Sequence, residues 1–262
     1  MLTSLLVLIS CVAPITGAEV KKFDFSDLPP AVKTVRLTDF FTEIQRESAV
    51  PIRFLRADLS LANLAGQTSF FPTETIVRYS VTSDVELENL LAHELGHVFL
   101  HVKGLSMDVR TSGLNDEFLN AIRDDISSAV EDYLIVKIML KRGFRPQLVW
   151  ENLANNLLNP QYIPPNIVAG DGFQRFAGLR LFCVLNQRGL FGNEVTITRE
   201  QLEKAAIALQ PNIVQHERNY QADVGTLDCN DAQSCFVKTK KLRDAVGFPS
   251  VTVRNPKTGI FE

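Results

Sequence analysis

The stretch LENLLAHELGHVFLHVKGL, Leu87–Leu105, contains three of the four histidines of the chain. Ser83 and Glu86 form a capping-box pattern just before it, and Gly104 is a natural C-terminal stop. We therefore expect one helix of about 20 residues between these signals. Apolar residues at helical spacing predict that the helix runs through the body of the protein: Leu87, Leu90, Leu91, Leu95, Val98 and Val102.

The histidines of this helix have the spacing of a metal site. His93 and His97 are four residues apart, about 6 Å along the axis, so both rings can reach one tetrahedral ion. Glu94 lies one position round, where its carboxylate can reach a metal-bound water, which completes an H-E-x-x-H motif. His101 stands about 12 Å from His93 in an unbroken helix, too far to share the ion. The motif therefore predicts two histidine ligands and a third ligand from elsewhere.

Residues Leu90–His101, LLAHELGHVFLH, resemble the active-site helix of the zincin metallopeptidases, and especially the AHELGH helices of the small repressor-cleaving and stress-response peptidases. Leu100 and Lys103 stand where metzincins have a helix-breaking glycine and a third histidine, which excludes that subclass. The resemblance implies a gluzincin-like enzyme that holds one Zn²⁺ per chain. It also implies hydrolysis of a peptide or protein substrate, with Glu94 as general base for a zinc-bound water.

In such an arrangement an acidic residue on a following helix completes the site, and a helix is predicted from near Asn115 to Gly143. We favour Glu131 as the third metal ligand, because an acid among Leu134, Ile135 and Ile138 needs a compensating partner. Glu117, Asp132 and Asp124 remain alternatives. Asp132 is also a candidate for orienting a histidine ligand from the outer shell. Ile135 stands where the family usually has a further acid, which leaves the subclass open.

The resemblance also implies a strand that pairs with extended substrate. The segment TIVRYSV, residues 75–81, directly precedes the metal helix and can either play this part or be a core strand. An oxyanion donor is needed as well, and His216, Arg218 and Tyr220 are candidates. A half-exposed polar helix explains these three residues more simply, so they stay outside the predicted site.

The patterns along the chain predict an α+β fold. Residues 50–56 and 74–82 are typical of strands, whereas most of the chain after Ser83 has helical periodicity. We expect one metallopeptidase-like domain over residues 19–262, with an N-terminal lobe at about 19–104 and a helical C-terminal lobe at about 105–262. Two further segments are expected to be loops: 159–166 and 188–193.

The N-terminal segment 1–18 has no charged residue and only a short apolar run, which favours a secretory signal cleaved after Ala18. Leu8–Cys11 also resembles a bacterial lipoprotein box, in which Cys11 is lipidated, and a core strand is a third interpretation. We expect an exported protein, secreted or periplasmic. Membrane attachment is expected only if Cys11 carries a lipid.

Composition limits the partners. The formal net charge is −3, and no basic run interleaved with aromatic residues suggests a nucleic-acid surface. Cys229 and Cys235 lie close enough in sequence for a local disulfide in an oxidising compartment, and Cys183 lies in an apolar run that suggests a buried thiol. Plain core packing of all three cysteines remains an alternative.

Two other functions fit the sequence. One is a catalytically inactive zincin-scaffold binding protein of the cell envelope, although an intact Glu94 argues against it. The other is an intracellular regulatory peptidase whose N-terminus is not a signal. The substrate, the cleavage preference and the oligomeric state do not follow from these residues.

Overall fold

The computed structural model describes residues 22–57, 66–80, 84–111, 117–159 and 168–262. The predicted signal segment and the Ser83 part of the predicted capping box lie outside these residues. The chain forms two compact units, the first made of residues 1–104 and 138–146, and the second of residues 105–137 and 147–262. The first unit therefore includes a segment, 138–146, that the sequence analysis placed in the C-terminal lobe.

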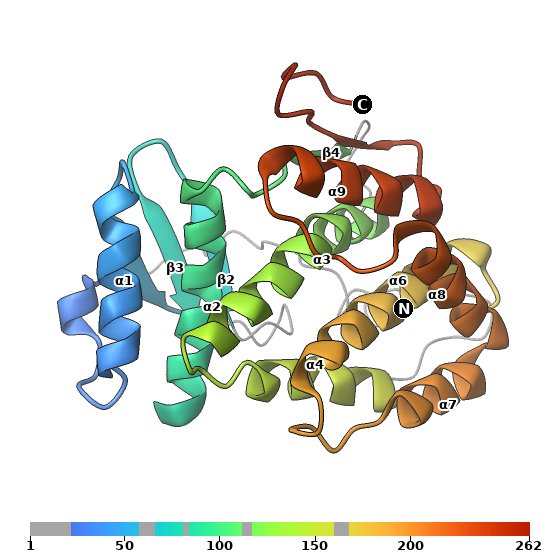
Figure 1. The fold of residues 1–262 in the computed structure, drawn as a ribbon, viewed down its shortest axis with the longest axis horizontal. Coiled ribbons are helices and arrows are strands. Elements are labelled where there is room, and N and C mark those ends of the chain that lie inside the picture. The colour runs from blue at the N-terminus through green and yellow to red at the C-terminus, as the bar shows by residue number, and fades with distance from the viewer. Residues whose placement is uncertain (1–21, 58–65, 81–83, 112–116, 160–167) are drawn as a thin grey trace. The chain divides into compact units, whose positions relative to one another are not determined.

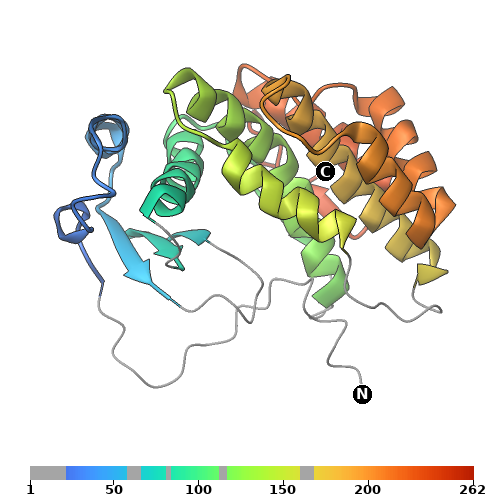
Figure 2. The ribbon, with the colours of Figure 1, turned by 90° about the horizontal axis from the view of Figure 1, so that it is seen from below.

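The first unit combines a small sheet with two helices (Figure 1). In chain order its elements are η2 (Phe25–Asp27), α1 (Val35–Glu47), β1 (Ile52–Arg56), β2 (Gly66–Phe70), β3 (Thr75–Tyr79) and α2 (Asp84–Val102). Helix α1 begins where the Thr34 side chain accepts a hydrogen bond from the Leu37 backbone N–H. Helices α1 and α2 lie on the same side of the strands (Figure 2).

Aromatic side chains form much of the core of this unit. Phe40 of α1 contacts Phe99 of α2, with ring centroids 5.8 Å apart, and Phe144, at 6.1 Å. Phe41 of α1 contacts Phe54 of β1 at 5.9 Å. Phe40 and Phe54 are fully buried, so α1 is anchored both to α2 and to the sheet.

The strand order in the first sheet is β1-β3-β2. Strand β3 pairs in parallel with β1 and antiparallel with β2, so both of its edges are already occupied. The suggestion that residues 75–81 pair with extended substrate is therefore wrong for 75–79, which form the central strand and fit the core alternative. Strand β2, which the sequence analysis did not predict, lies at the edge of the sheet.

Helix α2 matches the predicted metal helix closely. It is continuous from Asp84 to Val102, and Gly104 follows with a φ of 68°, the left-handed conformation that glycine adopts readily. The Gly104 N–H donates to the His101 carbonyl at 3.0 Å, which closes the helix end. The predicted length and the predicted stop are thus both confirmed.

Helix α3 (Glu117–Lys141) confirms the second predicted helix to within two residues at each end. Its residues 117–137 belong to the second unit, and its last turn belongs to the first. That last turn is held there by an ion pair between Arg142 and Glu43, 2.7 Å long. The Arg145 N–H also donates to the Asn89 side chain of α2 at 2.6 Å. The end of α3 and the residues that follow it are therefore fixed against α1 and α2.

The second unit is mainly helical. Besides most of α3 it contains β4 (Val109–Thr111), α4 (Gln147–Leu158), α6 (Asp171–Phe191), α7 (Arg199–Leu209), α8 (Pro211–Val224), α9 (Ala232–Val246) and β5 (Val251–Val253). Helix α8 packs against both α6 and α9, while β4 and β5 form a two-stranded antiparallel sheet. The coarse prediction of an α+β fold is confirmed.

Two local predictions in this unit have different outcomes. Residues 188–191 do not form the predicted loop, because α6 continues to Phe191 and ends only at Gly192, which has a φ of 56°. Cys229 and Cys235 are joined by a disulfide, whereas Cys183 is a half-buried free thiol. Across the described residues, we find no helix with the length and apolar content needed to cross a membrane.

Candidate metal centre

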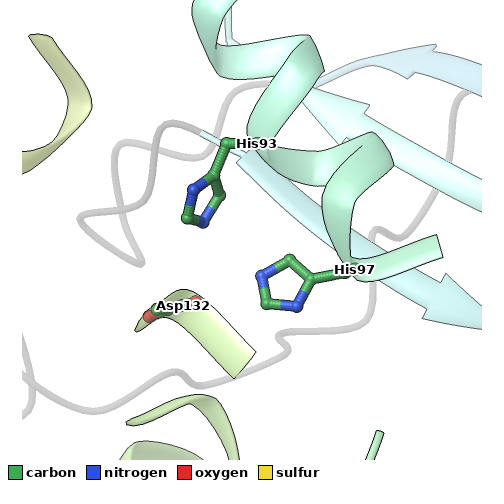
Figure 3. Close-up of side chains that lie close together, drawn as sticks. All are labelled: His93, His97 and Asp132. Carbon is green, nitrogen blue, oxygen red and sulfur yellow. The ribbon is translucent and has the colours of Figure 1, made fainter. Parts of the chain in front are cut away.

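Helix α2 presents His93 and His97 from one face, with both rings projecting to the same side (Figure 3). The ring centroids lie 5.2 Å apart and the ring planes meet at 81°. Burial and the neighbouring His97 charge lower the pKa of His93 to about 3. The His93 ring is therefore neutral near pH 7, which is the form that can bind a metal ion.

Glu94 lies between the two histidines in sequence and is almost completely buried, with 5% of its surface exposed. Burial raises the pKa of its carboxyl group, while the charge of His97 and a hydrogen bond from Thr68 act in the opposite direction. The Thr68 hydroxyl lies 2.8 Å from Oε2 of Glu94. A buried carboxylate with a raised pKa and a fixed partner has the properties of a general base.

Strand β2 passes directly over Glu94. A Cβ atom at Gly66 would lie 2.6 Å from Oε1 and 2.8 Å from Cγ of Glu94, closer than real Cβ contacts allow. The Thr68 hydroxyl oxygen also lies 3.1 Å from the backbone carbonyl oxygen of Glu94. Sequence reasoning missed both β2 residues, because the segment GQTSF has little apolar alternation and carries no signal that connects it with the metal helix.

Within the described residues, one group of three side chains could hold a metal ion: His93, His97 and Asp132. One ligand atom from each of these residues lies within 4.8 Å of the other two. Asp132 belongs to α3 and is half-buried (Figure 3). Asp132 was an alternative in the sequence analysis, both as a ligand and as an outer-shell residue.

The favoured residue, Glu131, is not in this group. Glu131 is buried, with 8% of its surface exposed, and its Oε1 accepts a hydrogen bond from the Met107 N–H at 3.2 Å. Asp124 forms an ion pair with Arg123 at 2.7 Å. The side chain of Glu117 lies outside the part of the chain that the structure describes.

The other histidines have different surroundings. His101 stacks on Phe70 at the end of β2, with ring centroids 4.0 Å apart and an interplanar angle of 17°. His216 of α8 stacks on Tyr220, whose hydroxyl donates to the Arg175 carbonyl at 3.2 Å. Packing within the second unit thus explains Tyr220, the candidate that is fully buried.

No protein-family model, curated protein or solved structure matches the chain. The functional assignment therefore depends on the chemistry of the residues themselves.

Proposed function

We propose that the protein is a zinc-dependent metallopeptidase of the zincin type. The observation that carries the proposal is the arrangement on α2, where two histidine rings contact each other and the residue that follows the first of them is a buried glutamate. A buried acid with a raised pKa is costly to the fold, and its position beside two potential metal ligands gives it a chemical use.

The three candidate ligands suit zinc. Two imidazole nitrogens and one carboxylate oxygen form a common catalytic zinc set, which leaves a fourth position open. With bonds of about 2.1 Å, a tetrahedral ion holds its ligand atoms about 3.4 Å apart. The ligand atoms of the three residues lie within 4.8 Å of one another, and zinc binding would require them to come closer. We therefore propose His93, His97 and Asp132 as the zinc ligands, with the sequence-favoured Glu131 as the competing third ligand.

Zinc, when bound, lowers the pKa of a coordinated water and polarises the carbonyl of the scissile peptide bond. The carboxylate of Glu94 accepts the proton of the attacking water and then delivers it to the amine that leaves. Its burial excludes bulk water from this exchange and keeps the pKa high enough for the carboxylate to act as a base.

The edge of the first sheet offers a place for substrate. Strand β2 pairs with β3 along one edge, and no strand among the described residues pairs with its other edge. An extended peptide can add to such an edge through backbone hydrogen bonds. Because β2 also contacts Glu94 through Thr68, a peptide on this edge lies next to the proposed base. We propose β2, rather than β3, as the substrate strand.

We also propose that the protein acts outside the cytoplasm. The bond between Cys229 and Cys235 supports this, since disulfides persist in oxidising compartments. Fractionation of cells that produce the full chain, together with sequencing of the mature N-terminus, tests the proposal. Cleavage after Ala18, or a lipidated Cys11, supports export, and an intact Met1 in the cytosol contradicts it.

Metal analysis combined with peptide hydrolysis tests the enzyme assignment. The purified chain should contain about one zinc, lose activity with a chelator and recover it when zinc is added. His93→Ala and His97→Ala should lose the metal. His101→Ala is the matched control, because His101 lies on the same helix but stacks on Phe70.

The outcomes separate the competing functions. Full zinc content in both His93→Ala and His97→Ala refutes the metal site. Zinc that disappears in these variants, in a protein without any hydrolysis, supports the binding-protein alternative. Zinc loss in His101→Ala shows that the geometry assumed for α2 is wrong.

A further inference from the structure

We infer that Thr68 is a positioning residue for Glu94, and that Gly66 provides the clearance that this position requires. The inference builds on the proposed function, in which Glu94 is the base. It assigns a role in catalysis to β2 that the H-E-x-x-H motif does not contain, and it concerns only contacts inside the first unit.

The Thr68 hydroxyl has two Glu94 oxygens within hydrogen-bond distance and shares its single proton between them. It lies 2.8 Å from the carboxylate Oε2 and 3.1 Å from the backbone carbonyl oxygen of the same residue. A glutamate side chain has three rotatable bonds, and a hydrogen bond to its charged end selects one arrangement among several. Because the hydroxyl contacts Oε2, the carboxylate is left with Oε1 to accept the proton of a water.

Gly66 allows β2 to come this close. The nearest atoms to a Cβ at this position all belong to the Glu94 side chain: Oε1 at 2.6 Å, Cγ at 2.8 Å and Cδ at 2.9 Å. Any other residue would push the carboxylate away from its place, or push β2 away from α2. The oxygen nearest to that Cβ is Oε1, the one that Thr68 does not contact.

The register of β2 brings both residues to the same face. Residues two apart in a strand point to the same side, so Gly66, Thr68 and Phe70 share a face. All three contact α2 or approach it closely, since Gly66 and Thr68 meet Glu94 and Phe70 stacks on His101. A shift of one residue would bring Gln67 and Ser69 to this face and turn the Thr68 side chain away from Glu94.

The test compares Thr68→Val with Thr68→Ser. Valine is close to threonine in shape but cannot donate, whereas serine keeps the hydroxyl. We expect Thr68→Val to lower kcat about 10- to 100-fold, because small displacements of a catalytic group have effects of this size. KM and zinc content should stay unchanged. Thr68→Ser should recover most of the activity, and Thr42→Val, which removes a hydroxyl bonded to Thr38 of α1, is the control.

A double-mutant cycle with Glu94→Gln shows whether Thr68 acts through Glu94. If it does, Thr68→Val lowers kcat in the wild-type background and has little further effect in Glu94→Gln. Three results would overturn the inference. They are a wild-type kcat in Thr68→Val, an equal loss of kcat from Thr68→Val in the wild-type and Glu94→Gln backgrounds, and a Thr68→Ser variant as slow as Thr68→Val. Wild-type hydrolysis that is independent of Glu94 overturns the proposed function instead.

A second cycle tests the contact without any activity. Gly66→Ala should lower the urea midpoint of the metal-free protein, and Glu94→Ala should relieve most of that loss by removing the atoms that the new methyl group meets. Equal shifts of the urea midpoint in the wild-type and Glu94→Ala backgrounds would show that Gly66 is not in close contact with the Glu94 side chain. The positioning role of β2 would then be refuted even if the protein is an active peptidase.

Discussion

Glu131→Gln and Asp132→Asn make a matched pair of isosteric changes at neighbouring positions of α3. Each replaces one carboxylate oxygen by an amide nitrogen, so shape is conserved and charge is lost. Adjacent residues on a helix point about 100° apart, and one of them cannot replace the other. We expect zinc affinity to depend on Asp132 and much less on Glu131.

The size of each effect follows from the contacts. The amide oxygen that Glu131→Gln introduces can still accept the Met107 N–H, so this change should lower the unfolding free energy of the metal-free protein less than Glu131→Ala does. Glu131→Ala leaves this buried N–H without that acceptor and should cost about 1–3 kcal/mol. Changing an outer-shell partner weakens metal binding about 10- to 100-fold. Loss of a direct ligand in Asp132→Asn should exceed this, which corresponds to more than about 2.7 kcal/mol.

Zinc affinity is measured by competition with a coloured chelator, and stability by urea unfolding in excess chelator. We expect Asp132→Asn to lose zinc, and Glu131→Ala to lose metal-free stability with little change in zinc affinity. A Glu131→Gln variant that loses zinc as strongly as expected for Asp132→Asn would refute the reasoning and restore Glu131 as the ligand. Equal affinities in all variants would exclude both acids.

Two further predictions concern stability. Burial opposes ionisation of Glu88, but hydrogen bonds from Arg36 and Thr34 outweigh this effect and hold the pKa of Glu88 below its ordinary value of 4.5. The ionised carboxylate therefore stabilises the fold fully above pH 4.5, and this stabilisation is lost as the pH falls further. Because the Arg36 side chain is 40% exposed, we expect Glu88→Gln to lower the unfolding free energy at pH 7 by only about 1–2 kcal/mol, as measured by urea unfolding. If the variant remains destabilised by the same amount well below pH 4.5, the ionised carboxylate is not the cause. The double change Cys229→Ser and Cys235→Ser opens a loop with a sequence separation of 6 and should lower the unfolding free energy by about 2 kcal/mol. An unchanged urea midpoint would contradict this prediction.

The elements that local signals determine were predictable from the sequence. The apolar stripe and Gly104 define α2, and a similar periodicity that ends at Gly143 defines α3. Residues of β1 and β3 are rich in β-branched and aromatic side chains, so their existence was also predicted. Glycine was a poor guide within α6, where Gly189 is accommodated in the helix and the left-handed Gly192 ends it.

The order of strands was not predictable, because pairing joins residues that are distant in sequence. Strand β3 precedes α2 directly, which suggested an edge strand, yet β1 and β2 occupy both of its sides. Strand β2 has a glycine and few apolar residues, so its pattern is weak. Only the fold reveals that this glycine is the point of closest approach to Glu94.

The histidines and Glu94 could be found from spacing alone, since one helical turn fixes their relation. The third ligand could not be chosen in this way. Glu131 is a buried acid among apolar residues, and one partner that the structure gives it is the Met107 backbone N–H. Hydrophobic surroundings thus predict that a buried acid has a partner without identifying which one.

Hydrolysis in water enriched in ¹⁸O tests the central claim most directly. The purified chain, loaded with zinc, is mixed with a peptide library, and the products are compared by mass with those from Glu94→Gln. The account predicts new C-termini that carry ¹⁸O with the wild-type chain, and a loss of these products by orders of magnitude with Glu94→Gln, which keeps its zinc. Equal amounts of labelled products from the two chains would contradict it, and so would a zinc-loaded wild-type chain that cuts no peptide.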